Sequence, residues 1–176
     1  PLEAAGVLGC MPNIPANRLS SQFDFGGPAY TLQAGADSGL HALRIARRAL
    51  LHGEIDAALI GAVDFCHEPV NRAAGNAAPL DAAIAWVLKR LSDAQRDGDR
   101  IHALIDDGEW AQADQPMMDA SFGDAGAAAG LLRASVAAVC LHHRRHADGR
   151  PWLSASARSL PVNTPGLPPL RLVEAR

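Results

Sequence analysis

Apolar residues recur at helical spacing after a capping residue in the first third of the chain. A helix should begin at Asp37 or Ser38, which are good N-cap residues, and end at His52-Gly53. Ahead of it, the run "AYTLQA" (29–34) is β-prone. Behind it, "DAALIGAV" (56–63) is a continuous apolar run between chain breakers, which is typical of a buried strand with parallel neighbours. Strand, helix and strand within about 35 residues predict a βαβ unit.

The hydrophobic pattern predicts further elements on both sides of this unit. A segment with hardly any polar face, Ala125–Leu141, should form a buried helix. The remaining predictions are a short helix over 16–22, strands over 83–89 and 101–106, a short helix and turn in "SDAQRDGDR" (92–100), a connection over 109–122, and an extended, proline-rich tail in which only 169–175 could form a strand. We expect one domain, with parts at 1–108, 109–122 and 123–176.

Composition narrows the class of protein. The chain has 176 residues, of which 48% are hydrophobic and 20% are charged, so it can build a core. A net charge of −3 argues against nucleic acid as the main partner. Three cysteines (Cys10, Cys66 and Cys140) lie far apart and no signal peptide is evident, which indicates reduced thiols in a cytoplasmic protein. No apolar run is long enough to predict a membrane span, and a start at Pro1 suggests a trimmed or excised chain.

Four segments together resemble one enzyme family. They are "MPNIPANRLSSQFDFGGPAYTLQAGADSGLHAL", "LLHGEIDAALIGAVD", "WVLKRLSDAQRDGDRIHALI" and "GDAGAAAGLLRASVAAVCLHHR". In this order they are similar to motifs of the β-ketoacyl-ACP synthases of fatty acid and polyketide assembly. The resemblance implies an α/β chain with the thiolase-like layered fold, in which a mixed sheet is packed by helices. It also implies an incomplete version, because the family's segment before "MPN" and its glycine-rich C-terminal motif are not recognisable here.

The chain departs from the family at the residues that carry the chemistry. Where the family has the nucleophilic cysteine of its "TACSSS" run, this chain has Ala36, followed by Asp37 and Ser38. A methyl group cannot attack a thioester. Where the family has the histidine of "GHxxxAAG", the register gives Gly123-Asp124, and a carboxylate there opposes the charge that an oxyanion needs. The family's other histidine motif, "HGTGT", is missing. The resemblance therefore implies that Ala36, Asp37, Ser38, Gly123 and Asp124 form an elbow or acyl pocket without catalytic groups.

Other candidate sites have simpler interpretations. Cys66, His67 and Glu68 are adjacent on an extended segment, where neighbouring side chains point to opposite faces, so a structural cysteine is favoured over a nucleophile–base pair. The cluster of His142, His143 and His146 with Arg144 and Arg145 reads as a solvated helix end rather than a metal site. The carboxylates Asp106, Asp107, Glu109 and Asp114 lack the spacing of a calcium loop. We predict no metal and no cofactor.

One helix face offers a candidate docking surface. His41, Arg44, Arg48 and His52 recur at three- and four-residue spacing and share a face. An acyl carrier protein, or the phosphate of its phosphopantetheine, could dock there. A solvated basic stripe is the simpler interpretation of the same spacing.

The sequence thus favours a non-catalytic partner over an enzyme. The interpretation is a chain-length-factor-like subunit of a polyketide synthase or a polyunsaturated fatty acid synthase, which pairs with an active ketosynthase or a second copy through the 29–34 strand. Two alternatives stay open. One is a decarboxylase-type variant with glutamine as the active residue, although Gln33 lies three residues too early for that role. The other is a remnant or fragment without function.

Overall fold

The computed structural model describes residues 3–73, 79–106, 123–144, 159–162 and 170–174. The chain divides into two compact units, Pro1–Gln33 and Ala34–Arg176. Each unit is described by itself.

The first unit consists of two short helices, α1 (Ala4–Gly9) and α2 (Ile14–Phe23). The predicted helix over 16–22 is α2, and α1 was not expected. Asp24 ends α2 in the left-handed conformation, which lets Phe25 N donate to Ser20 O. No residue of either helix is buried, so this unit has no core of its own.

The second unit is built on an antiparallel pair of strands, β1 (Ala57–Asp64) and β2 (Ala82–Lys89). Ala57 lies opposite Lys89, and Asp64 lies opposite Ala82. Both strands were predicted within one residue, but the expectation of parallel neighbours for the first strand was wrong. Its apolar run does not reflect burial on both faces. Every second residue packs on helices, while Leu59, Val63 and Val87 on the other face are exposed.

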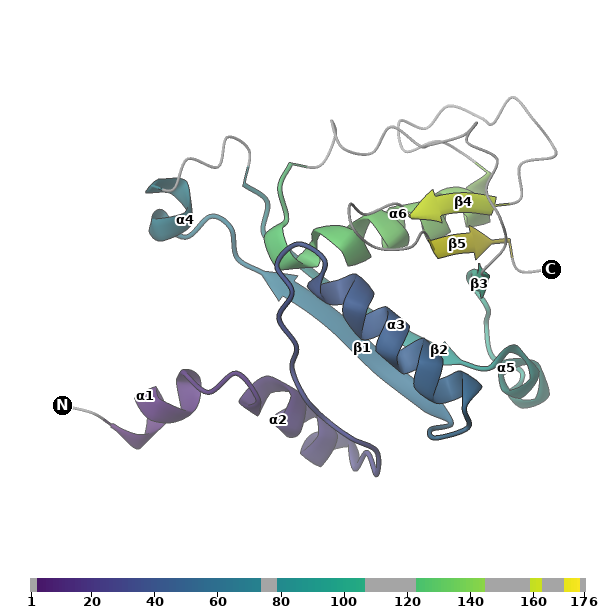
Figure 1. Ribbon diagram of the computed structural model, residues 1–176, viewed down its shortest axis with the longest axis horizontal. Helices are drawn as coiled ribbons and strands as arrows, with labels where there is room; N and C mark the ends of the chain where they lie inside the picture. The colour runs from purple at the N-terminus through teal and green to yellow at the C-terminus, as the bar shows by residue number, and fades with distance from the viewer. Residues whose placement is uncertain (1–2, 74–78, 107–122, 145–158, 163–169, 175–176) are drawn as a thin grey trace. The chain divides into compact units, whose positions relative to one another are not determined.

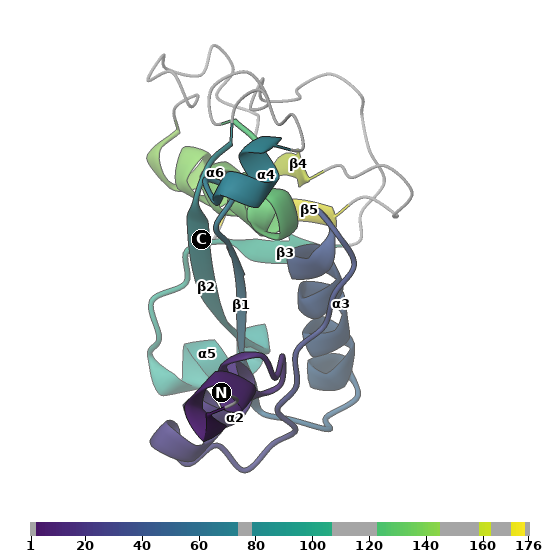
Figure 2. The same cartoon turned by 90° about the vertical axis from the view of Figure 1, so that its left-hand side faces the viewer.

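Two helices cover the inner face of this strand pair (Figures 1 and 2). They are α3 (Ser38–Leu51), which begins and ends as predicted, and α6 (Ala129–His143), which follows the 3₁₀ turn η1 (Gly126–Ala128). The core cluster consists of Leu40, Leu43, Ala46, Ile60, Leu131, Ala134, Ala137, Cys140, Leu141 and Leu172. Over 129–141 only Val139 is exposed, at 57% of its surface, so the prediction of a largely buried helix is confirmed.

The crossing of α3 and α6 depends on two glycines. A β-carbon built on Gly39 would lie 2.7 Å from Leu131 Cβ, and one built on Gly130 would lie 2.8 Å from Leu40 Cγ. Real side chains do not approach this closely, so any larger residue at either position would push the helices apart.

The predicted strand over Ala29–Ala34 does not form. Its residues are irregular, apart from an isolated bridge between Ala34 and Ala36. A strand needs a neighbour for its backbone groups, and the strands that the structure describes pair elsewhere. In the described part of the chain, the expected βαβ unit therefore lacks its first strand.

The remaining elements form the rest of the second unit. A three-stranded antiparallel sheet has the order β3-β5-β4, with β5 (Leu170–Val173) between β3 (Leu104–Asp106) and β4 (Ser159–Val162). The two short helices are α4 (Pro69–Ala73) and α5 (Leu91–Asp97). Strand β5 confirms the prediction for 169–175, whereas β4 and α4 were not expected. The predicted connection over 109–122 lies outside the described residues. Among the described helices, none is long and apolar enough to cross a bilayer.

Candidate functional site

The turn before α3 is closed by a serine. Gly35 has a φ of +58°, which turns the chain sharply. Ser38 Oγ donates to Gly35 O at 2.7 Å and accepts from Ala34 N at 2.9 Å, and Ser38 is buried. Asp37 occupies the N-cap position but makes no side-chain capping bond. Ser38, not Asp37, therefore holds the predicted elbow together.

Ala36 lies in this elbow with an exposed side chain. Its carbonyl oxygen accepts a hydrogen bond from Gly130 N at 3.3 Å. This bond joins the elbow to the first turn of α6, a segment more than ninety residues later in the chain. The side chain itself is a methyl group, which can neither donate nor accept a proton.

Asp124 caps the turn that leads into η1. Its Oδ1 accepts from Gly126 N at 2.9 Å, and its carbonyl oxygen accepts from Leu80 N at 2.8 Å. The residue before it, Gly123, has a φ of +69°. Ala36 and Asp124 thus both contact the segment that begins α6, Ala36 through Gly130 and Asp124 through Gly126. Asp124 acts there as a backbone acceptor.

One residue of this region was missed by sequence reasoning. Asp64, the last residue of β1, accepts a hydrogen bond from Ala127 N through Oδ2 at 2.7 Å. Its signal in the sequence was weak, because a polar residue that directly follows a buried strand usually marks only the end of the strand.

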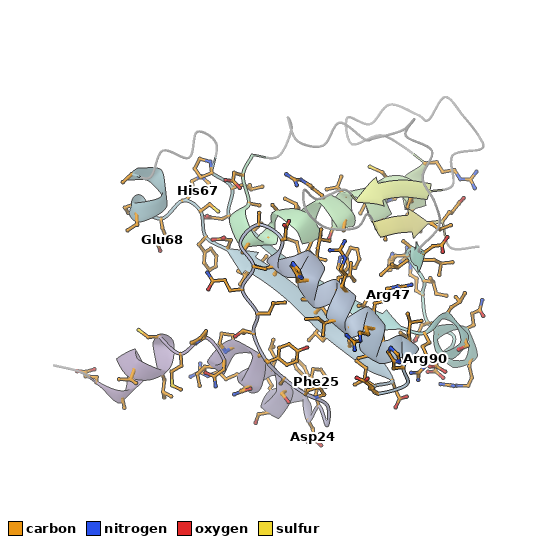
Figure 3. All side chains as sticks on the ribbon, viewed as in Figure 1. Asp24, Phe25, Arg47, His67, Glu68 and Arg90 are labelled. Atoms are coloured by element: carbon orange, nitrogen blue, oxygen red, sulfur yellow. The ribbon has the colours of Figure 1, made fainter. Side chains whose placement is uncertain are left out.

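Cys66 and His67 have separate environments. Cys66 is 3% exposed, and burial, followed by the charges of Asp64, Asp124 and Asp81, raises the pKa of its thiol. His67 instead pairs with Asp81, whose Oδ1 accepts from His67 N at 2.9 Å and lies 3.2 Å from Nδ1. Glu68 is exposed in the same connection between β1 and α4 (Figure 3). A buried thiol held in the neutral form is a poor nucleophile.

The predicted docking stripe on α3 is only partly accessible. Arg48 and His52 are exposed, whereas His41 and Arg44 are half-buried. Burial lowers the pKa of Arg44, against the raising effect of the Asp37 carboxylate. Arg47 lies on the same helix (Figure 3). Carrier docking through His41, Arg44 and Arg48 stays a prediction.

The C-terminal end of α6 carries a group of exposed rings. The ring centroids of His142 and His143 lie 5.0 Å apart, and those of His142 and His102 lie 5.9 Å apart. Arg144 Nη2 pairs with Glu174 Oε1 at 2.7 Å. The described residues contain no group of three or more histidine, cysteine or acidic side chains that could hold a metal ion. Arg145, His146, Asp107, Glu109 and Asp114 lie outside the described residues.

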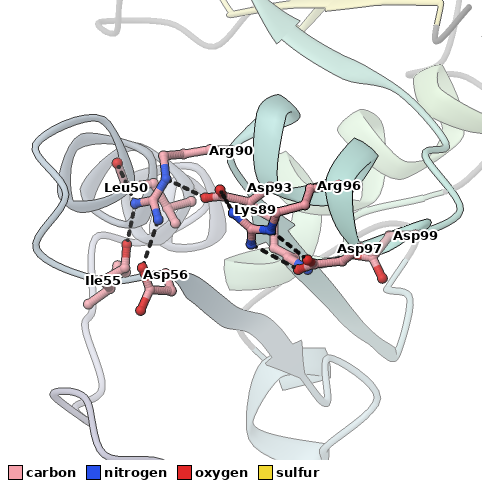
Figure 4. A network of polar contacts seen from close by, with 9 residues as sticks. All are labelled: Leu50, Ile55, Asp56, Lys89, Arg90, Asp93, Arg96, Asp97 and Asp99. Atoms are coloured by element: carbon pink, nitrogen blue, oxygen red, sulfur yellow. Dashed lines mark hydrogen bonds and ion pairs between the residues drawn. The ribbon is translucent and has the colours of Figure 1, made fainter.

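A charged network lies at the end of the strand pair where β1 begins and β2 ends (Figure 4). The Arg90 guanidinium donates to Ile55 O at 2.7 Å and Leu50 O at 3.2 Å, and pairs with Asp56 and Asp93. It thereby joins the end of α3, the approach to β1 and the start of α5. The neighbouring pairs of the network are Lys89–Asp97, Lys89–Asp99, Arg96–Asp93 and Arg96–Asp97.

Comparison with known protein families identifies the family of this chain. The family model described as "Beta-ketoacyl synthase, N-terminal domain" matches residues 2–98, which is more than half of the chain. The chain belongs to the β-ketoacyl synthase family. The matched range includes the elbow with Ala36, and ends before the turn with Asp124.

Relatives of this family are large synthases. The chain is 34% identical over 169 residues to phthioceranic/hydroxyphthioceranic acid synthase of Mycobacterium tuberculosis, an alignment that covers 80% of this chain and 8% of that protein. It is 38% identical over 132 residues to the PKS-NRPS hybrid synthetase ATPKS of Aspergillus niger, which covers 59% of this chain and 7% of that protein. The chain therefore spans less than a tenth of the length of these relatives.

Solved ketosynthases share the fold. The ketosynthase from module 6 of the bacillaene synthase of Bacillus subtilis matches 100% of this chain and 53% of its own, with a TM-score of 0.73 and 17% identity. The oxazolomycin ketosynthase domain OzmH KS7 of Streptomyces albus matches 94% of this chain and 50% of its own, with a TM-score of 0.72 and 17% identity. The predicted thiolase-like α/β fold class is thus confirmed, for a chain that spans about half of a solved ketosynthase.

Proposed function

We propose that this chain is a non-catalytic ketosynthase-like component that pairs with an active ketosynthase in fatty acid or polyketide biosynthesis, in the manner of a chain-length factor. The family and the fold are those of ketosynthases of polyketide synthases. Its role in such an assembly would be architectural, to complete a dimer and shape the acyl site of the active partner.

The observation that carries this proposal is Ala36 in an otherwise formed elbow. The turn has its glycine, its serine bonds and its link to Gly130, and it presents a methyl group at the position that the motif resemblance assigns to the family's nucleophile. Covalent catalysis requires an activated nucleophile with a base in reach. Ala36 provides no nucleophile, and the hydroxyl of Ser38 is already bonded to Gly35 O.

The nearby groups do not replace the missing chemistry. Cys66 is buried, and the carboxylates around it favour its neutral thiol. Asp124 directs one oxygen at Gly126 N, and its negative charge would oppose an oxyanion rather than stabilise it. Both features support a loss of condensation and of decarboxylation.

The test of inactivity is a turnover assay on the full chain. Malonyl and acyl carrier substrates would be supplied, and carbon dioxide release and condensation product measured, with an active ketosynthase as the positive control. We expect no rate above background. Turnover that disappears in Asp37→Ala or Asp124→Ala would refute the proposal, and carbon dioxide release without condensation would support the decarboxylase alternative instead.

The proposed partner is an active ketosynthase or a second copy, bound through residues 29–34. Support comes from their irregular backbone, which leaves a β-prone run without a neighbouring strand among the residues that the structure describes. A partner strand could pair with it. Contact with the phosphopantetheine of an acyl carrier protein is proposed on the exposed part of α3, at Arg48.

The test of pairing is association in solution. Leu32→Pro removes one backbone donor from the run and should weaken association with a ketosynthase before it affects the helices. Tyr30→Phe, which keeps the backbone donors, is the matched control. A monomer at high concentration, with no affinity for any ketosynthase offered, would leave the chain-length-factor role without support.

A further inference from the structure

The carboxylate of Asp64 reaches from the end of β1 to the turn that begins α6. Oδ2 accepts from Ala127 N at 2.7 Å across 63 positions of sequence, and the bond is partly buried. The residue beside it, Gly126, has a φ of +50°, and a β-carbon built there would collide with the Asp64 carboxyl group and lie 3.0 Å from Cys66 Sγ. The carboxylate therefore occupies the space that a side chain at position 126 would need.

The same turn continues directly to the elbow. Ala128 and Ala129 are buried, and Gly130 N then donates to Ala36 O at 3.3 Å. A continuous series of contacts thus connects Asp64, at the end of β1, to Ala127, and then Gly130 to Ala36. A shift of the turn relative to β1 would shift the donor that holds the elbow.

Asp124 binds a neighbouring amide, but its contact is of a different kind. It accepts from Gly126 N two positions ahead, so its side-chain bond stays within the turn. Asp64 reaches the turn from the strand pair. Of these two carboxylates, Asp64 is thus the one whose bond ties the turn to the sheet. A bond between an ionised acceptor and an amide is also stronger than one between neutral groups.

We propose that Asp64 is a positioning residue, which fixes the start of α6 against β1 and thereby holds the carbonyl of Ala36 at Gly130. This goes beyond the proposed function, because the site would keep its shape in this way whether or not it retains any chemistry. The Cys66 thiol beside Asp64, with its raised pKa, adds no competing charge at neutral pH.

The test is amide hydrogen exchange on the full chain, followed by NMR. In Asp64→Ala, the amides of Ala127 and Gly130 should exchange about tenfold to a hundredfold faster, as expected for loss of one charge-assisted bond, while the amides between β1 and β2 keep their rates. Asp64→Asn keeps an oxygen acceptor of the same shape and should restore most of the protection at Gly130. Asp124→Ala is the matched control and should affect Gly126 alone.

Three outcomes would overturn the proposal. One is unchanged exchange at Gly130 in Asp64→Ala, which would make Asp64 a local cap only. Another is an equal effect of Asp124→Ala at Gly130. The third is uniform acceleration across the strand pair, which would show a general loss of stability. None of these readouts depends on turnover, so an active chain would refute the proposed function without deciding the role of Asp64.

Asp64→Asn also covers the case in which Asp64→Ala fails to fold. Its amide oxygen is a neutral and weaker acceptor, so exchange should become faster at Ala127 and at Gly130 together, by a smaller factor than in Asp64→Ala. Faster exchange at Ala127 alone would contradict the positioning role.

Discussion

Trp86 Nε1 donates a hydrogen bond of 2.9 Å to Ser135 Oγ. The serine hydroxyl in turn donates to Leu131 O at 2.9 Å, one turn earlier in α6. This relay joins β2 to α6 through a partly buried pair of side chains and satisfies the indole N–H, which would otherwise lose its partner on folding.

Removing the Ser135 hydroxyl should destabilise the fold, because the indole N–H of Trp86 loses its acceptor. In Ser135→Ala the donor of Trp86 is left without its acceptor, which we expect to cost about 1–2 kcal/mol of unfolding free energy. Denaturant titration measures it. In a double-mutant cycle with Trp86→Phe, the two losses of unfolding free energy should not add up. Once the indole N–H is gone, removal of the Ser135 hydroxyl leaves no indole donor without an acceptor. Strictly additive losses would mean that the bond contributes nothing.

The burial of α6 predicts losses of stability of different size for three substitutions to aspartate. Ala137 is 0% exposed, so Ala137→Asp should destabilise by about 3 kcal/mol or more, because an unpaired charge would be buried. Val139→Asp lies on the exposed side and should change stability little. Val136→Asp, at a half-buried position, should fall between them. Thermal or denaturant unfolding of the three variants, compared with the parent chain, checks the order.

Restoring the nucleophile alone should not restore condensation. Ala36→Cys keeps the elbow but supplies neither histidine of the family, and each positioned acid–base group typically contributes about 10²–10⁴-fold. The new thiol should react with iodoacetamide faster than the buried Cys66, which mass spectrometry can follow. Working synthase activity from this single change would contradict our account of the missing groups.

The charged network predicts a loss of stability in acid. Hydrogen bonding from Arg90, first among its causes, lowers the pKa of Asp93 below its ordinary value of 3.8. A depressed pKa means that the carboxylate stabilises the fold fully above that value, and that this contribution is lost as the pH falls through the lower folded pKa. Asp93→Asn should therefore be less stable than the parent at pH 6, and the difference should shrink below pH 3. Thermal midpoints from pH 6 to pH 2.5 test this, and a difference that grows in acid would contradict it.

The elements that could be predicted are those with strong local signals. The helix from Ser38 to Leu51 has a residue type favoured at helix starts, a leucine face and a glycine after its end, and β1 and β2 are apolar runs between breakers. Strand direction was not predictable in this way. A run that is apolar on both faces suggests parallel neighbours, but in β1 the outer face is exposed and the partner is antiparallel.

The sequence singled out residues of the candidate site but not their contacts. The motif resemblance points to Ala36 and Asp124, because motifs specify residue types at fixed spacing, and the roles assigned to these two residues stay predictions. The bonds Ala127–Asp64 and Gly130–Ala36 join segments that are 63 and more than 90 positions apart, and no local pattern encodes them. The prediction of a strand over 29–34 was wrong for a related reason, because β-propensity cannot supply a neighbouring strand.

The two glycines at the crossing of α3 and α6 bear on how such a chain changes over generations. At Gly39 and Gly130 even one added methyl group meets Leu131 or Leu40 within 2.8 Å, so amino-acid substitutions there would disturb the packing of both helices. Ala36 is exposed, so a different side chain there need not disturb that packing. A substitution at position 36 can therefore change the chemistry of the elbow and leave the backbone in place, whereas a substitution at Gly39 or Gly130 displaces the helices. Selection on packing and selection on chemistry thus act on different positions of this chain.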